Sequence, residues 1–226
     1  MPNHDTIQAV IFDLDGVITD TAEQHFQAWK TIADELGIPF TRAFNENLKG
    51  VSRMDSLRLL LSQAESPLDY TLEQMDEWAD RKNKIYQRLI EEITPGDILP
   101  GIAEFLTELQ QRGIKTAIAS ASKNAFTVMN RLELTDAFDH IVDASLIQNT
   151  KPDPEVFLKA AEVLGVEPGR CVGVEDAVAG VHAIKAAGMF AVAIGAPEAF
   201  PHADFILPRT DELTWDRLAE VYKLRR

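Results

Sequence analysis

Four short apolar runs, each ending at polar residues, constrain the fold of this chain more than any other feature of its sequence. A strand buried on both faces of a parallel sheet has this length and this continuous apolar character. Between the runs lie amphipathic segments, each followed directly by a glycine, which commonly ends a helix. We therefore predict an α/β fold with a Rossmann-like, doubly wound parallel sheet. The expected strands are residues 8–12, 115–119, 170–174 and 190–194, and the expected helices are residues 101–112, 154–164 and 177–187.

Residues 21–93 interrupt this alternation, because they show helical spacing of apolar residues and no convincing strand. An all-helical insert directly after the first strand is expected to form a unit of its own, a cap. We predict an α/β core of residues 1–20 and 94–226 and an inserted all-helical cap domain of residues 21–93. One helical stripe of the cap consists of Phe26, Trp29, Ile32, Ala33 and Leu36.

The formal net charge of −14 narrows the range of partners. An acidic surface repels nucleic acids and anionic membranes, so neither is an expected partner. No window reaches the ~18 apolar residues of a membrane helix, the N-terminus lacks the pattern of an export signal, and the single Cys171 excludes an internal disulfide. We expect a cytoplasmic protein, a monomer because nothing demands a partner subunit, whose substrate is a small molecule.

The polar residues that follow the predicted strands should meet, because the ligand crevice of an open parallel sheet lies beyond the carboxyl ends of its strands. Asp13 and Asp15 follow the first strand, and Glu175 and Asp176 follow the third. Four carboxylates in one crevice repel one another unless a hard cation relieves the repulsion. We predict a Mg²⁺ site made by Asp13, Asp15 through its backbone carbonyl, Glu175 and Asp176. These motifs contain no histidine, which disfavours zinc.

A carboxylate beside such an ion can also attack phosphorus. Asp13 is the candidate nucleophile and Asp15 the candidate general acid/base, since neighbouring carboxylates push the pKa values of such a pair apart. Ser120 can donate a hydrogen bond to the transferred phosphoryl group, and Lys151 can balance its charge. Each motif alone has a simpler explanation, because Asp-x-Asp-Gly suits a turn and Glu175-Asp176 suits a helix start. Their shared position at strand ends favours catalysis.

In chain order, Asp13-Leu14-Asp15-Gly16-Val17, Ser120, Lys151 and Glu175-Asp176 resemble the four motifs of the haloacid dehalogenase superfamily of phosphotransferases. The match spans residues 8–195, and it implies an α/β core with a helical cap after the first strand. Further segments are similar to the β-phosphoglucomutase family: 21–25, 49–56, 81–83 and 120–124. That resemblance implies a Mg²⁺-dependent interconversion of β-D-glucose 1-phosphate and glucose 6-phosphate through a phosphorylated Asp13 and β-glucose 1,6-bisphosphate.

The resemblance also implies which residues contact the sugar phosphate. In the core they are Gly16, Ser120, Ala121, Ser122, Lys123, Asn124 and Lys151. In the cap they would contact the sugar and the distal phosphate or govern closure: Thr21, His25, Lys49, Gly50, Val51, Arg53, Ser56, Lys82 and Asn83. Met54 stands where an acidic residue is common in the family, and we interpret it as a solvent-side variation.

Four alternatives stay open on the residues themselves. Local chemistry around Lys49 and Arg53 also fits a helix–helix loop with solvated cations, and His25 also fits a structural role. A sugar-phosphate phosphatase on the same scaffold would need one phosphate site and access for water, whereas a mutase needs two phosphate sites and a lid that excludes water. A phosphosugar-binding protein without catalysis is the fourth alternative.

Overall fold

The computed structural model describes residues 6–64 and 69–225. These residues form two compact units. One, the core, takes in the chain up to Asp20 and from Thr94 onward. The other, the cap, takes in Thr21–Ile93.

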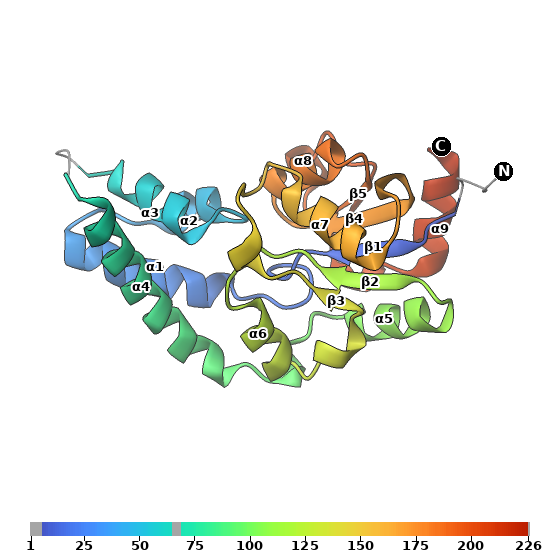
Figure 1. Ribbon diagram of the computed structural model, residues 1–226, viewed down its shortest axis with the longest axis horizontal. Helices are drawn as coiled ribbons and strands as arrows, with labels where there is room; N and C mark the ends of the chain where they lie inside the picture. The colour runs from blue at the N-terminus through green and yellow to red at the C-terminus, as the bar shows by residue number, and fades with distance from the viewer. Residues whose placement is uncertain (1–5, 65–68, 226) are drawn as a thin grey trace. The chain divides into compact units, whose positions relative to one another are not determined.

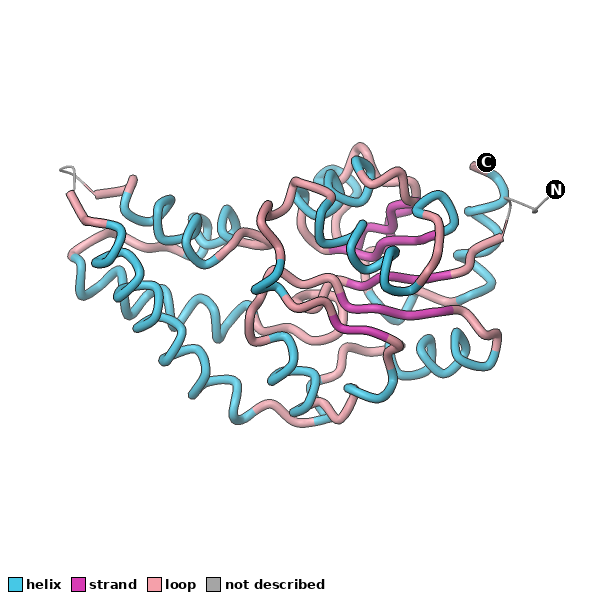
Figure 2. Tube along the Cα trace, viewed as in Figure 1, coloured by secondary structure: helices cyan, strands magenta, loops and turns pink. Residues whose placement is uncertain are grey.

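The described part of the core contains a six-stranded sheet in which every pairing is parallel and the strand order is β3-β2-β1-β4-β5-β6. Figure 2 shows the strands side by side with helices around them. The chain fills one half of the sheet before it returns to fill the other, which confirms the doubly wound fold. The strands are β1 (Ala9–Phe12), β2 (Lys115–Ile118), β3 (His140–Ile141), β4 (Cys171–Glu175), β5 (Phe190–Ile194) and β6 (Phe205–Leu207).

Alternate residues of β1 face opposite sides of the sheet, as strand geometry requires. Ile11 belongs to an apolar cluster with residues of α7 (Glu155–Leu164) and α8 (Val178–Ala186). Phe12 points the other way, with its ring centroid 6.1 Å from that of Phe105 on α5 (Ile102–Gln111). Figure 1 shows these helices on opposite faces of the sheet, with α7 and α8 on one face and α5 on the other. Because helices cover both faces of the sheet, the ends of the strands form its polar edge.

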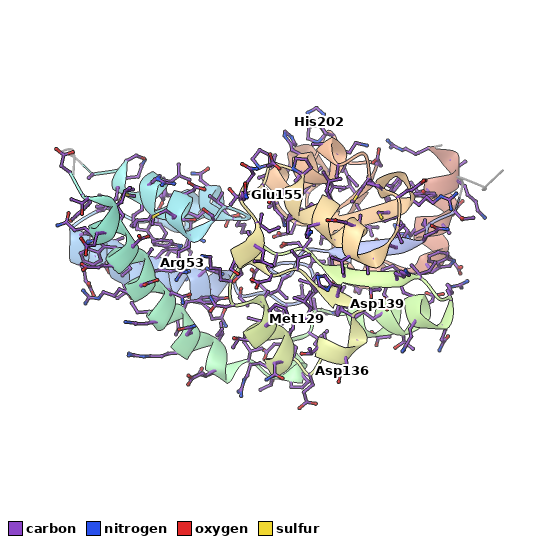
Figure 3. The ribbon with its side chains drawn as sticks, in the orientation of Figure 1. Arg53, Met129, Asp136, Asp139, Glu155 and His202 are labelled. Carbon is purple, nitrogen blue, oxygen red and sulfur yellow. The ribbon has the colours of Figure 1, made fainter. Side chains whose placement is uncertain are left out.

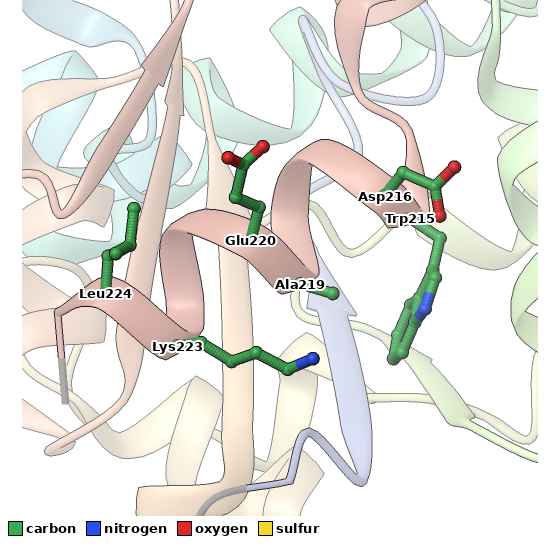
Figure 4. A pocket seen from close by; sticks show the side chains of 6 residues that line it. All are labelled: Trp215, Asp216, Ala219, Glu220, Lys223 and Leu224. Carbon is green, nitrogen blue, oxygen red and sulfur yellow. The ribbon is translucent and has the colours of Figure 1, made fainter.

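Two further helices complete the described core. α6 (Ala125–Arg131) follows β2, and α9 (Trp215–Leu224) packs Tyr222 against Phe190 of β5, with ring centroids 5.1 Å apart. A surface depression lies along α9 (Figure 4). All of its lining side chains come from this one helix, and none belongs to the predicted site: Trp215, Asp216, Ala219, Glu220, Lys223 and Leu224. Among the described residues, no helix combines the length and apolar character needed to cross a membrane.

All regular secondary structure in the described residues of the cap is helical. Its helices are α1 (Ala22–Leu36), α2 (Arg42–Asn45), α3 (Arg53–Leu61) and α4 (Leu72–Leu89). Its apolar centre contains Trp29, Ile32 and Leu57, together with the predicted stripe of α1. Met54 is partly buried and packs against this centre, so its interpretation as a solvent-side variation is wrong. A thioether fills an irregular apolar gap, which an acidic side chain could not do without a partner.

Candidate active site

Asp13 and Glu175 stand at the two neighbouring strands where the direction of winding reverses. Asp13 follows β1, and its backbone N–H donates to the carbonyl of Val174 on β4 over 2.9 Å. Glu175 is the last residue of β4 and is fully buried. In doubly wound folds this switch point opens a crevice, because the connecting helices leave the sheet on opposite faces. The fold thus places two carboxylates at the position where such sheets bind ligands.

Lys151 lies between these carboxylates. Its Nζ donates to Asp13 Oδ1 over 2.6 Å and to Glu175 Oε2 over 2.8 Å, and its side chain is inaccessible to solvent. The ammonium also lies 5.0 Å from the ring centroid of Phe157. Burial by itself lowers the pKa of Lys151, but the charges of Asp13 and Glu175 outweigh that effect and raise it. Lys151 is therefore a fixed positive charge, as its predicted role requires.

Three carboxylates converge next to this cation. One ligand atom from each of Asp13, Glu175 and Asp176 lies within 4.8 Å of the other two. Desolvation, together with repulsion from Asp13 and Asp176, raises the pKa of Glu175 to about 8, although Lys151 opposes the shift. An all-oxygen donor set with excess negative charge fits a hard divalent cation such as Mg²⁺. The structure thus brings together Asp13, Glu175 and Asp176 of the predicted metal ligands.

Asp15, the fourth predicted ligand, lies in a tight turn after Asp13. Leu14 is fully buried and anchors the turn, while the side chain of Asp15 is partly buried. Gly16 adopts a φ of 76°, and its N–H donates to the carbonyl of Thr19 over 2.8 Å. A Cβ at Gly16 would lie 2.2 Å from Oδ2 of Asp176. Glycine is needed here both for the turn and for the approach of Asp176.

The loop after β2 carries the predicted core contacts of residues 120–124. Ser120 is buried, and its Oγ accepts the N–H of Ser122 over 3.1 Å. A hydroxyl can accept and donate at once, so Ser120 can still donate to a phosphoryl oxygen. Asn124 is buried, Ala121 and Ser122 are partly buried, and Lys123 is exposed. The loop therefore presents one ammonium and several small polar groups.

The segment that leads to Lys151 is held by Glu155. Its two carboxylate oxygens accept the backbone N–H groups of Gln148 and Asn149 over 2.9 and 2.7 Å. Figure 3 labels Glu155 at the start of α7. This contact fixes the backbone ahead of Lys151, which explains how a long, flexible side chain reaches a buried position.

In the cap, His25, Lys82 and Thr21 form one polar cluster. Lys82 Nζ lies 2.8 Å from His25 Nδ1, and the hydroxyl of Tyr86 donates to Thr21 Oγ1 over 3.3 Å. The rings of His25 and Tyr86 stack at 4.1 Å. Desolvation, followed by the charge of Lys82, holds the pKa of His25 well below its usual range. The imidazole is therefore neutral near pH 7 and accepts from Lys82 at Nδ1.

Sequence reasoning did not single out Tyr86, although it stacks on His25. Lys82 also lies over its ring, with Nζ 4.6 Å from the centroid. Tyr86 lies one helical turn after Lys82 on α4, so their i, i+4 spacing in the sequence could have indicated this contact.

The remaining predicted cap residues lie in or beside α3 and α4. Arg53 begins α3 (Figure 3), donates to the carbonyl of Ala79 over 3.4 Å, and pairs with Asp80 at 3.6 Å. Burial lowers the pKa of Arg53, against the opposing effect of Asp80 and Asp76. Lys49 pairs with Glu46 at 2.9 Å. Gly50 has a φ of 70°, Ser56 is buried, and Val51 and Asn83 are partly buried. These cationic groups are held by acidic neighbours within the cap.

The chain is similar to known proteins in both sequence and fold. Residues 7–188 match the model of the haloacid dehalogenase-like hydrolase family. The chain is 48% identical to a β-phosphoglucomutase of Bacillus subtilis, over 96% of each chain. It is 33% identical to a phosphorylated carbohydrates phosphatase of Thermotoga maritima, over 81% of this chain and 82% of that protein. The crystal structure of a Clostridium difficile β-phosphoglucomutase superposes with a TM-score of 0.95 at 44% identity, covering 97% of this chain and 99% of that one.

Proposed function

The chain belongs to the haloacid dehalogenase-like hydrolase family, and within it we propose that this protein catalyses the β-phosphoglucomutase reaction. The reaction interconverts β-D-glucose 1-phosphate and β-D-glucose 6-phosphate. It proceeds through a phosphorylated Asp13 and β-glucose 1,6-bisphosphate. The partner is a small sugar phosphate, and the protein works as a monomer.

One observation carries this proposal: the buried Lys151 holds Asp13 and Glu175 together at the switch point of the sheet. The hydrogen bond from Lys151 fixes the direction of the Asp13 carboxylate, which a nucleophile needs for in-line attack. The same ammonium offsets negative charge as an incoming phosphoryl group approaches. A structural ion pair alone would not explain the further carboxylate of Asp176, which has a ligand atom within 4.8 Å of those of Asp13 and Glu175.

The reaction begins with Asp13 carrying a phosphoryl group. Asp15 removes the proton from a sugar hydroxyl, the hydroxyl oxygen forms a bond to phosphorus, and the bond between phosphorus and Asp13 breaks. The product is the bisphosphate. After the bisphosphate turns end for end, Asp13 attacks its other phosphoryl group, and Asp15 returns the proton to the leaving sugar oxygen. Protons and phosphoryl groups balance over the cycle.

Asp13, Glu175, Asp176 and the backbone carbonyl of Asp15 would hold Mg²⁺, which supplies positive charge that stabilises the transferred phosphoryl group. Ser120 donates to that group, and Lys123 with its neighbours takes the second phosphate from the core side. We assign the sugar and the distal phosphate to the cap side chains of Thr21, His25, Lys49, Arg53, Ser56 and Lys82, with Gly50, Val51 and Asn83 beside them. The ammonium and guanidinium groups among these side chains can donate hydrogen bonds to a phosphate, which supports this assignment.

Product analysis tests the proposal. The protein is incubated with Mg²⁺, β-D-glucose 1-phosphate and a trace of β-glucose 1,6-bisphosphate. We expect glucose 6-phosphate to accumulate with little inorganic phosphate. Steady release of inorganic phosphate in place of glucose 6-phosphate would refute the mutase.

A phosphatase is the second candidate, because one relative bears that name at 33% identity. The His25–Lys82 cluster favours the mutase over this alternative. The ammonium of Lys82, next to the neutral imidazole of His25, would supply positive charge for a second phosphate. A phosphatase gains nothing from a second phosphate site. Comparison of several hexose 1-phosphates in the same assay separates the two candidates by product.

A further inference from the structure

We propose that Gly180 of α8 is a positioning residue for the metal site, because its lack of a side chain gives the Glu175 carboxylate its place. The inference concerns how the cation proposed above is bound, and it rests on the proposed function to that extent. Gly180 touches neither substrate nor cation in this account. It acts through Glu175.

The carboxylate of Glu175 folds back over the start of α8. Its Oε1 accepts the backbone N–H groups of Asp176 and Ala177 over 3.3 and 3.2 Å, and its Oε2 accepts from Lys151. The N-cap residue of α8, Ala177, has no side chain that could do this. Glu175 therefore satisfies two backbone donors just ahead of α8, where a negative charge is also stabilised.

This arrangement requires an empty position at residue 180. A Cβ placed on Gly180 would lie 2.0 Å from both Cδ and Oε2 of Glu175 and 2.4 Å from Cγ. These distances are far below van der Waals contact. Gly180 is itself buried in the first turn of α8, so the carboxylate lies directly against its Cα.

The backbone of α8 gives no other reason for glycine here. Among the described residues, the glycines with positive φ do not include Gly180. Alanine is the better helix former at such a position, since glycine has more conformational entropy to lose. The close approach of Glu175 is thus the feature of this site that selects glycine.

An added methyl group at residue 180 is expected to disturb the metal site and to leave the fold intact. The overlapping atoms all belong to one side chain, so we expect Glu175 to rotate away while α8 keeps its place. That rotation breaks the contact to Lys151 and displaces one of the three carboxylates. A displaced ligand or supporting group typically weakens metal binding by roughly 10–100-fold.

The test measures ion binding without turnover. Mn²⁺, which accepts the same oxygen donors as Mg²⁺, is titrated into the protein, and the free ion is counted by electron paramagnetic resonance. The variants are Gly180→Ala, Glu175→Ala and the double variant, with Ala186→Gly as a control that weakens α8 at an exposed position away from Glu175. Because no catalysis is involved, failure of the mutase reaction would not affect the result.

We expect Gly180→Ala to weaken Mn²⁺ binding by roughly 10–100-fold and Ala186→Gly to leave it unchanged. The double variant lacks the Glu175 side chain that the added methyl group would displace. Its Mn²⁺ binding should therefore be no weaker than that of Glu175→Ala, and its melting temperature should be equal to or higher than that of Glu175→Ala. Parental affinity in Gly180→Ala, or effects that multiply in the double variant, would overturn the inference. If Gly180→Ala does not fold, a folded double variant supports the inference, and an unfolded one contradicts it.

Discussion

Lys151 sets the electrostatics of the strand ends. It forms two short ion pairs in a place that solvent does not reach, and no smaller or neutral side chain could neutralise both Asp13 and Glu175 there. Removing one partner of such a buried group leaves an unpaired charge, which is costly. The residues of this cluster are therefore coupled, and the effects of their substitutions should not simply add.

Replacing Asp15 should separate chemistry from binding. Asp15→Asn keeps the shape of the turn but cannot move a proton, so we expect kcat to fall by about 10²–10⁴-fold with KM little changed. Steady-state kinetics of glucose 6-phosphate formation measure both constants. An increase in KM at unchanged kcat would show instead that Asp15 binds substrate and does not transfer protons.

Metal affinity should depend on pH through Glu175. The pKa of its carboxyl is raised to about 8, so at lower pH a cation must displace a proton to bind. Apparent affinity should therefore fall as the pH falls below about 8, by at most about tenfold per pH unit, and level off above it. Mn²⁺ titrations from about pH 6 to about pH 9 measure this dependence. Glu175→Gln is the control and should lose it, while a flat profile in the parental protein would contradict the assignment.

The contribution of the capping box to the stability of α4 can be tested by substitution. Thr71 Oγ1 accepts the N–H of Gln74 over 3.2 Å, and Gln74 Oε1 accepts the N–H of Thr71 over 2.9 Å. Thr71→Ala should destabilise α4 by about 1 kcal/mol, seen as faster hydrogen exchange in this helix. Thr107→Ala, which removes an exposed hydroxyl within α5, is the matched control. Equal exchange in both variants would mean that the box does not stabilise α4.

The sequence predicted the long elements and missed the short ones. The four apolar runs form β1, β2, β4 and β5 with ends shifted by at most one residue, since each is buried on both faces. β3 has two residues and β6 has three, too few to show a periodic pattern. Their place in the sheet comes from pairing with β2 and β5, which is a tertiary effect.

The candidate site was predictable to a similar degree. Strand ends identified Asp13, Ser120 and Glu175, because parallel topology gathers them at one edge. Lys151 lies in the segment after the short β3, which no apolar run had indicated. The contacts of Tyr86 and Gly180 could not be found in this way, because both depend on which side chain lies opposite in three dimensions. Met54 was misplaced for the same reason.

At the scale of the whole molecule, the predicted metal ligands all belong to the core unit. A cation that binds only the folded core should stabilise that unit selectively, by about 1.4 kcal/mol at roughly ten times its dissociation constant. Mg²⁺ should therefore slow hydrogen exchange in β1 and β4 and leave the described helices of the cap unchanged. Mass spectrometry of peptides with and without Mg²⁺ measures this. Equal protection of both units would contradict a metal site confined to the core.

The proposed phosphorylation of Asp13 can be tested by trapping the phosphorylated protein. The protein is mixed with Mg²⁺ and β-glucose 1,6-bisphosphate, quenched in acid and treated with borohydride, which reduces an acyl phosphate to an alcohol. Peptide sequencing should then find homoserine at position 13 and aspartate at position 15. Homoserine at another position, or an unmodified Asp13 in protein that forms glucose 6-phosphate, would contradict the account.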